Sequence, residues 1–178
     1  MDIISATQTT VEQAQAWARS KGASEAFIAI AAFYWAQATA IGINPEGAYC
    51  QAAHETGYGN FGGTDKQFSA TAAMHNLCGL KSHDGSVTQS FYCWEDGIAA
   101  HLDHLALYAG VDGYPKSNSL DPRQFASIKS LAKTFLALGT HWAPDPDYGK
   151  YIEELAVGLR AYRSDASKLK EIGLIINS

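Results

Sequence analysis

Basic residues are scarce in this sequence. The chain of 178 residues has 13 Lys and Arg against 18 Asp and Glu, a net charge of -5, and no stretch gathers the basic residues together. A protein that binds nucleic acid needs such a stretch to neutralise the phosphates. We therefore expect no nucleic-acid partner.

Cysteine is also scarce, with three residues and no pair spaced as C-x-x-C. Neither a disulfide framework nor a zinc site follows from this number and spacing, so the thiols are expected to be buried in the core. Six histidines are present, but no H-E-x-x-H pattern occurs, and the His101 and His104 pair has no carboxylate at a ligand spacing. We expect no metal, no other cofactor, and activity that survives EDTA.

The longest uncharged run covers residues 26–45, but polar side chains such as Gln37 and Thr39 interrupt it. A buried core helix fits this run better than a membrane span does, so no integral membrane segment is expected. Asp2 and a polar segment follow Met1, without a basic stretch leading into an apolar one. We expect synthesis in the cytoplasm and action after release, or an extracellular location if the chain has been trimmed.

The length predicts one domain, residues 1–163, with 164–178 as a tail or linker. Capping residues and apolar spacing predict helices over residues 11–21, 24–41, 45–57, 94–110, 127–138 and 147–162, the second of them central to the core. The first has a capping box from Thr9 to Glu12. Strand-like pieces at 79–81 and 87–92 flank Asp84-Gly85, a hairpin turn signal. The predicted fold is mainly α with one small inserted β hairpin.

Glu55 is the acid that the sequence singles out. It lies at the expected C-terminal end of the helix over 45–57, where the helix dipole disfavours a carboxylate. No Lys or Arg occurs between Lys21 and Lys66 to stabilise its charge. A carboxyl that stays protonated near neutral pH is what a general acid for a glycosidic oxygen requires. The plain alternative is a solvated residue at a helix end.

The neighbouring sequence favours the catalytic interpretation. The strings QAAHETGYGN (51–60), HNLCGLK (75–81), SFYCWEDGI (90–98) and WAPDPDY (142–148) resemble motifs of glycoside hydrolase family 73. These are bacterial and phage endo-β-N-acetylglucosaminidases with a lysozyme-like helical fold that cut peptidoglycan. The resemblance implies an enzyme that hydrolyses the β-1,4 bond after N-acetylglucosamine, as the catalytic domain of an endolysin or autolysin.

Carried over by position, Glu55 matches the family's general acid, and Tyr148 keeps an aromatic of the last motif. Many relatives have a tyrosine where this chain has Trp142, and many have a second carboxylate in a longer hairpin. Here the hairpin's acid is Asp84, which is a candidate base or an ordinary turn residue. For contacts to the saccharide the expectation is the set Tyr58, Phe61, Asn76 and Trp142.

Three alternatives stay open at this point. A muramidase or lytic transglycosylase would share the fold and the glutamate but cut the other linkage. A non-catalytic module would bind wall glycan without cutting it. A cysteine peptidase would need an activated Cys50 or Cys78, for which the flanking residues give no support. The expected partner is the peptidoglycan glycan strand, bound by a monomer with a separate wall-binding domain, since a net negative charge gives no attraction to an anionic wall.

Overall fold

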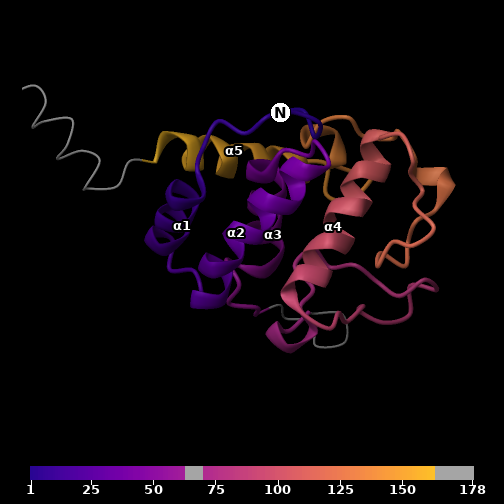
Figure 1. Ribbon diagram of the computed structural model, residues 1–178, viewed down its shortest axis with the longest axis horizontal. Coiled ribbons are helices and arrows are strands. Elements are labelled where there is room, and N and C mark those ends of the chain that lie inside the picture. The colour runs from indigo at the N-terminus through magenta and orange to yellow at the C-terminus, as the bar shows by residue number, and fades with distance from the viewer. Residues whose placement is uncertain (63–69, 163–178) are drawn as a thin grey trace, which may run out of the picture.

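The computed structural model describes residues 1–62 and 70–162. Five α-helices follow one another with short 3₁₀ turns between them (Figure 1). Their bounds are α1 (Val11–Ser20), α2 (Glu25–Ala40), α3 (Pro45–Thr56), α4 (Trp94–Ala109) and α5 (Tyr148–Ala161), with 3₁₀ turns η1 (Ala72–Met74), η2 (Ala126–Ile128) and η3 (Leu136–Leu138). The fold is mainly α, as the sequence predicts.

Local capping explains where the helices begin. The side chain of Ser24 accepts a hydrogen bond from the backbone of Phe27 at the start of α2, and Asn44 does the same for Gly47 at the start of α3. At α1 the cap is Thr10, which accepts from Gln13 N, one residue later than the expected Thr9. The five helices therefore start within one residue of the positions where the sequence signals place them.

The central helix is α3, and not α2 as expected from its apolar sequence. Ten of the twelve α3 residues are buried, against seven of sixteen in α2. Small residues make this possible: a Cβ on Gly47 would lie 2.2 Å from the Phe135 ring. Neighbouring helices α2 and α5 both pack on α3, and α5 contacts α3 near both of its ends, at Glu46 and at Glu55. A helix of Ala and Gly has a weak hydrophobic signal but allows close packing on all sides.

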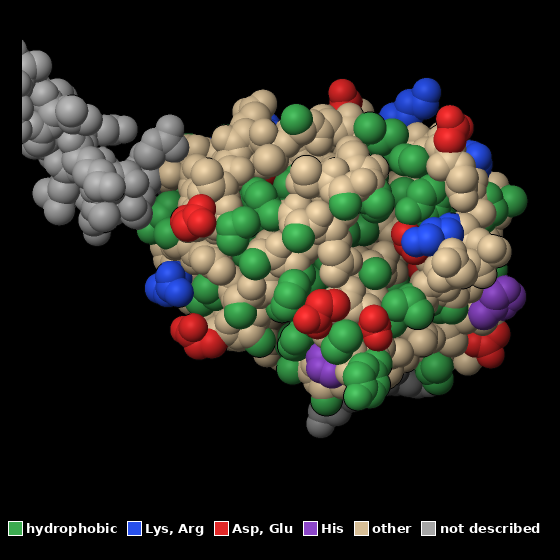
Figure 2. All heavy atoms as spheres, in the orientation of Figure 1, with side chains coloured by type: hydrophobic (Ala, Val, Ile, Leu, Met, Phe, Trp, Pro, Cys, Tyr) green, Lys and Arg blue, Asp and Glu red, His purple; other side chains and the backbone are tan. Residues whose placement is uncertain are grey.

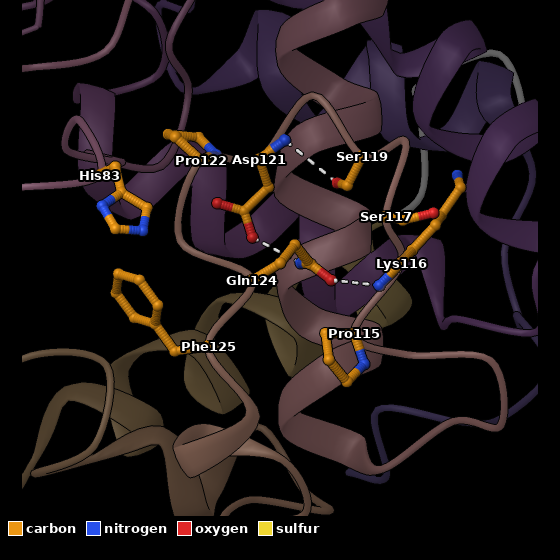
Figure 3. A pocket seen from close by; sticks show the side chains of 9 residues that line it. All are labelled: His83, Pro115, Lys116, Ser117, Ser119, Asp121, Pro122, Gln124 and Phe125. Atoms are coloured by element: carbon orange, nitrogen blue, oxygen red, sulfur yellow. Dashed lines mark hydrogen bonds between the residues drawn. The ribbon is translucent and has the colours of Figure 1, made fainter.

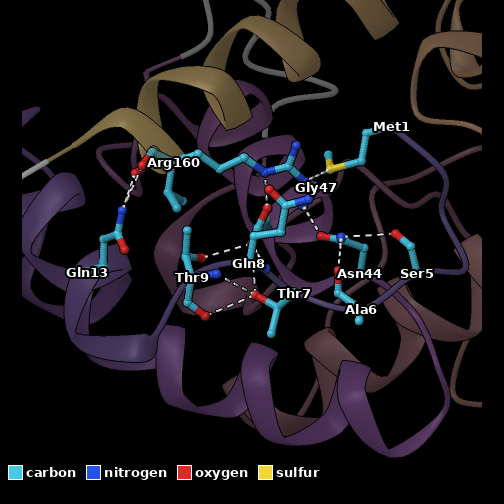
Figure 4. A network of polar contacts seen from close by, with 12 residues as sticks. Met1, Ser5, Ala6, Thr7, Gln8, Thr9, Gln13, Asn44, Gly47 and Arg160 are labelled. Carbon is cyan, nitrogen blue, oxygen red and sulfur yellow. Dashed lines mark hydrogen bonds and ion pairs between the residues drawn. The ribbon is translucent and has the colours of Figure 1, made fainter.

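The first nine residues run across the outside of this core and are bound to it. Ile3 pairs with Asn44 and with Lys133 through backbone hydrogen bonds. Beneath them the fully buried Glu46 accepts hydrogen bonds from Thr7 and Thr9 and from Arg160 on α5 (Figure 4). Burial alone would raise the pKa of Glu46, but these donors and the guanidinium lower it. This ion pair is structural and links the N-terminal segment to α3 and α5.

The expected hairpin is reduced to one antiparallel bridge between Lys81 and Thr88, with no strand among the described residues. Its turn is present, because Gly85 N donates to Ser82 O. Two backbone bonds cross the hairpin, from Ser82 N to Val87 O and from Gln89 N to Leu80 O, and the pairing does not continue into strands. The strand prediction for residues 87–92 is therefore wrong.

The helix predicted over residues 127–138 is also wrong. The segment holds two separate 3₁₀ turns, η2 and η3, and Ser130 between them has a positive φ of 65°. Its backbone bonds go to other segments instead: Ser130 N donates to Leu107 O, Ala132 N to Tyr108 O, and Phe135 N to Met1 O. Tertiary pairing replaces the helical bonds that the local apolar spacing predicts.

The described part of the chain shares one main hydrophobic core, and the predicted tail at 164–178 lies outside the described residues. On the face in Figure 2, basic and acidic side chains are scattered among small hydrophobic areas. Among the described residues, no helix combines the length and apolarity that crossing a membrane demands.

Candidate active site

Glu55 lies in the last turn of α3, two residues before the left-handed Gly57 that ends the helix. Its side chain is exposed to solvent, and protein atoms are dense around its carboxyl. Together these observations describe a carboxyl that a ligand can reach from outside but that has little bulk water around it. Of the site residues predicted from the sequence, Glu55 is the one whose surroundings suit a catalytic carboxyl.

Tyr148 is the first residue of α5 and contacts Glu55 directly. Its hydroxyl donates a 2.5 Å hydrogen bond to Oε1 of Glu55, although the two residues are 93 positions apart. Gly149 makes this approach possible, because a Cβ there would lie 2.2 Å from the carbonyl oxygen of Leu136. The ring of Tyr148 is buried, so its hydroxyl is held in place beside the carboxyl.

Trp142 is a second donor to the same carboxyl, through its indole N–H. Its ring packs edge-on against His104 at 4.9 Å and His101 at 5.6 Å, and lies 5.7 Å from Tyr108. The tryptophan that replaces the tyrosine of many relatives therefore reaches the general-acid candidate. It also keeps a hydrogen-bond donor there, although the phenol is lost.

The pKa of Glu55 is raised to about 6. Burial is the largest cause, because loss of water destabilises the carboxylate. The hydrogen bonds from Tyr148 and Trp142 act in the opposite direction and limit the rise. The result is a carboxyl that is protonated in about half of the molecules at pH 6 and in about a tenth at pH 7, far more than at the ordinary value, as general-acid catalysis requires.

The loop from Asn76 to Leu80 brings a glycine against Glu55. Gly79 has a φ of 69°, and a Cβ on it would lie 3.3 Å from Oε2 of Glu55. Asn76 shapes this loop: its amide donates to Leu80 O and Gln89 O, both at 2.8 Å, and accepts from Leu80 N at 3.1 Å. A glycine is therefore favoured here both by the left-handed backbone and by the nearby carboxyl.

The burial of Asn76 contradicts the expectation that this residue contacts the glycan. The residue is 0% exposed and its amide is used within the loop. It cannot touch a ligand in this arrangement, because its polar atoms are enclosed and already bonded. Asn76 instead holds Gly79 in position beside Glu55.

Two aromatics expected to line a saccharide groove lie at the margin of the core. Tyr58 is half-buried and packs on Trp17 at 5.6 Å and on Phe27 at 6.4 Å. Phe61 is stacked on Trp94 with ring centroids 6.3 Å apart. Both rings follow the end of α3 with positive φ values. Part of each ring remains accessible, and a role in binding sugar stays a prediction.

Asp84 lies exposed in the turn between Lys81 and Thr88. Its Oδ1 accepts hydrogen bonds from Ser82 Oγ at 2.6 Å, Ser86 Oγ at 2.8 Å and Ser86 N at 3.0 Å. The Ser82 bond contributes most to lowering its pKa to about 2. These contacts are those of a turn aspartate, and the same carboxylate is a weak base.

The thiols of Cys50 and Cys78 have no nucleophilic character. Cys50 and Cys78 are buried, and burial raises the pKa of each well above its ordinary value. Cys93 is half-buried. Within residues 1–62 and 70–162, no group of three or more His, Cys, Asp and Glu could hold a metal ion. The prediction that Cys50 and Cys78 are packed in the core is confirmed.

Sequence reasoning missed three residues behind the site. Gln51 donates to the Tyr148 hydroxyl at 2.9 Å, His101 contacts Gln51 at 3.1 Å, and Tyr34 contacts His101 at 2.8 Å. All three are 0% exposed. Their signal in the sequence was weak, since nothing local distinguishes them from the other polar residues of these helices. His101 is a fully buried core histidine.

A separate depression of about 370 Å³ lies beside the loop that follows α4 (Figure 3). His83 and Phe125 line one side of it, with ring centroids 5.0 Å apart. The buried Asp121 at its base already binds His104 and Gln124, at 2.7 and 2.6 Å. Glu55 does not line it, so this depression is distinct from the candidate active site.

A helical domain with a raised-pKa glutamate at a helix end, next to a tyrosine donor, defines a lysozyme-like glycoside hydrolase. Residues 31–160 match the model of the glucosaminidase family, described as mannosyl-glycoprotein endo-beta-N-acetylglucosaminidase. The chain belongs to this family and is a glycoside hydrolase that acts on glycans. The matched range contains Glu55, Trp142 and Tyr148.

An uncharacterized protein of Borreliella burgdorferi is 32% identical over 127 residues. The match covers 69% of this chain and 58% of that protein, so the chain spans a little over half the length of this relative. No solved structure matches the chain significantly.

Proposed function

We propose that this domain hydrolyses the β-1,4 bond on the reducing side of N-acetylglucosamine in peptidoglycan, with Glu55 as general acid. The observation that carries the proposal is the accessible Glu55 carboxyl, with its pKa near 6 and two donors on it. Family membership supports the reaction class, and the four motifs support the wall as substrate.

In the proposed reaction Glu55 gives its proton to the leaving glycosidic oxygen. The hydrogen bonds from Tyr148 and Trp142 then stabilise the carboxylate that forms, because charge-assisted hydrogen bonds are stronger than neutral ones. These two hydrogen bonds become stronger as the proton leaves Glu55. They therefore stabilise the transition state more than the bound substrate, which lowers the barrier to cleavage. On the opposite face of the sugar ring, either a carboxylate activates a water molecule or the 2-acetamido group of the substrate acts as the nucleophile.

Accessible aromatic surface would hold the sugar rings beside Glu55. Trp142 contacts the carboxyl directly, and Phe61 and Tyr58 follow the same end of α3. Aromatic faces are suited to stacking on sugar rings. We assign substrate contact to these three residues and loop positioning to Asn76.

The linkage test is mass spectrometry of borohydride-reduced fragments after digestion of purified peptidoglycan. The proposal predicts new N-acetylglucosamine ends with wild-type protein and none with Glu55→Gln. Muramic or anhydromuramic ends would show a muramidase or lytic transglycosylase instead. Wall binding without new ends, unchanged in Glu55→Gln, would show a binding module.

We also propose that the domain is the catalytic part of an endolysin or autolysin that reaches the wall after release from the cytoplasm. This rests on the resemblance to bacterial and phage enzymes that cut peptidoglycan. Expression in the bacterial cytoplasm tests it: lysis is expected with a co-expressed holin and not without one. Lysis that is independent of the holin, or equal for Glu55→Gln, would contradict it.

A further inference from the structure

We propose that Tyr34, His101 and Gln51 are positioning residues that fix the Tyr148 proton on Oε1 of Glu55 and leave Oε2 as the oxygen that transfers its proton. The inference rests on the proposed role of Glu55 as general acid. It assigns a function to three buried side chains that do not touch Glu55 themselves.

These residues form one continuous hydrogen-bonded chain across three helices. Tyr34 Oη on α2 is 2.8 Å from His101 Nδ1 on α4, and His101 Nε2 is 3.1 Å from Gln51 Oε1 on α3. Gln51 Nε2 is 2.9 Å from the hydroxyl of Tyr148, which is 2.5 Å from Glu55 Oε1. The chain therefore runs from the middle of the core to the carboxyl.

The donors of this chain point the same way. The Tyr34 hydroxyl donates to Nδ1 of His101, so the ring carries its proton on Nε2 and donates it to Gln51 Oε1. The Gln51 amide then donates to Tyr148, whose own proton goes to Glu55. The reverse direction would free the Tyr34 proton, for which the described residues show no second acceptor.

Burial preserves this direction. Tyr34, Gln51 and His101 are each 0% exposed, so water has no access to exchange their partners. Burial also lowers the pKa of His101 to about 3, which keeps the ring neutral and able to accept from one partner while donating to the other. Each member therefore has one orientation that satisfies both of its neighbours.

For Glu55 the consequence is a difference between its two oxygens. Oε1 is an acceptor, because the Tyr148 hydroxyl donates its proton to this oxygen. A proton on the carboxyl is then carried by Oε2, the oxygen that lies beside Gly79. When that proton passes to the leaving oxygen, the new negative charge faces a line of aligned donors, which strengthen one another.

Few other titratable groups lie around this hydrogen-bonded chain among the described residues. His104 and Asp121 lie near His101, and their effects on its pKa oppose each other. Cys78 lies near Glu55 and Tyr148 with its pKa raised well above the ordinary value, so it stays neutral. The alignment of the chain thus does not depend on the charge state of a neighbour within the working pH range.

Two buried tyrosines provide a matched test. Tyr34→Phe removes the hydroxyl at the far end of the chain. Tyr49→Phe removes an equally buried hydroxyl from α3 that donates to the carbonyl of Phe27. The Tyr49 ring packs on Tyr34 at 5.7 Å and is kept in the variant, and its hydroxyl is not a member of the hydrogen-bonded chain to Glu55. Each variant loses one hydrogen bond and gains no charge, so similar losses in thermal stability are expected.

The experiment measures kcat, KM and the pH dependence of kcat/KM on soluble uncrosslinked glycan strands. Tyr34→Phe should lower kcat by about two- to tenfold and move the basic limb of the profile to higher pH, because Glu55 loses donor strength. Tyr49→Phe should change neither. Gln51→Met, which breaks the chain next to Tyr148, should give a larger change of the same kind.

Equal kinetics for Tyr34→Phe and Tyr49→Phe would overturn the inference, and so would a loss confined to stability or KM. Glu55→Gln, assayed in parallel, separates this failure from that of the proposed function. An inactive Glu55→Gln beside an unaffected Tyr34→Phe would remove only the positioning role. If Gln51→Met does not fold, the tyrosine pair decides alone.

Discussion

The hydroxyl of Tyr148 and the carboxyl of Glu55 join the start of α5 to the end of α3, with the tyrosine as donor. This contact links a residue with a raised pKa to a buried group that stabilises its charged form. It makes the pH dependence of the enzyme sensitive to single substitutions near the carboxyl.

Tyr148→Phe should weaken catalysis and alter its pH dependence. Loss of the hydroxyl removes a hydrogen bond that lowers the pKa of Glu55, so the pKa rises above about 6. The acid must be protonated to act, so the basic limb of kcat/KM should move to higher pH while kcat falls by about tenfold or more. An unshifted limb measured on soluble glycan strands would exclude this role for Tyr148.

Gly79→Ala should impair catalysis more than folding. The residue has a φ of 69°, and the new Cβ would lie 3.3 Å from Oε2 of Glu55. Gly85→Ala is the control, because its φ is 77° and its Cβ would meet only Arg123 at 3.6 Å. Both should lose about 1 to 2 kcal/mol of stability from left-handed strain, measured by urea unfolding.

Only Gly79→Ala should also lower kcat in that comparison. The reason is the crowding of the oxygen assigned to proton transfer, which Gly85 does not approach. If both variants kept wild-type kcat, Oε2 would not be the oxygen that faces the substrate.

Asp84→Asn should keep activity within about threefold of wild type. The Asp84 carboxylate bonds Ser82 and Ser86, and its pKa of about 2 makes it a poor base. The measurement is the rate of release of reducing ends from peptidoglycan. A loss of about a hundredfold or more, in a variant that unfolds at the wild-type temperature, would restore Asp84 as the catalytic base.

Glu55→Gln should stabilise the protein in a pH-dependent way. The native pKa of Glu55, about 6, exceeds the reference value of 4.5, so the protonated form favours folding below 4.5 and this contribution is lost as the pH rises through 6. A neutral glutamine avoids the loss. The difference in Tm between variant and wild type should therefore grow from pH 4 to pH 7, as measured by calorimetry.

The opposite trend, a difference that shrinks as the pH rises, would contradict the raised pKa. A difference that does not change with pH would place the titration of Glu55 at its ordinary value. Either result would remove the main support for a general acid at this position.

Local signals predicted the helix that carries Glu55. Asn44 caps α3, Pro45 opens it, and Gly57 ends it in the left-handed conformation, as the sequence indicates. These are interactions between residues a few positions apart, which a single sequence reveals directly. The place of Glu55 at the helix end follows from them.

The support behind Glu55 could not be predicted in the same way. Gln51 and His101 are 50 positions apart, and Tyr34 and His101 are 67 apart, so only packing of the three helices brings them together. The central position of α3 was also missed, because its small residues give little hydrophobic signal. For residues 127–138 the local pattern predicted a helix, but backbone bonds to α4 and the N-terminal segment replace it.

The most direct test of the account is the release of reducing ends from purified peptidoglycan by Glu55→Gln, compared with wild type and with Glu25→Gln. Glu25 is exposed in the first turn of α2, so its variant controls for the loss of one carboxylate. The account predicts wild-type rates for Glu25→Gln and a loss of about 10²- to 10⁴-fold for Glu55→Gln. A Glu55→Gln variant that releases ends at the wild-type rate would contradict it.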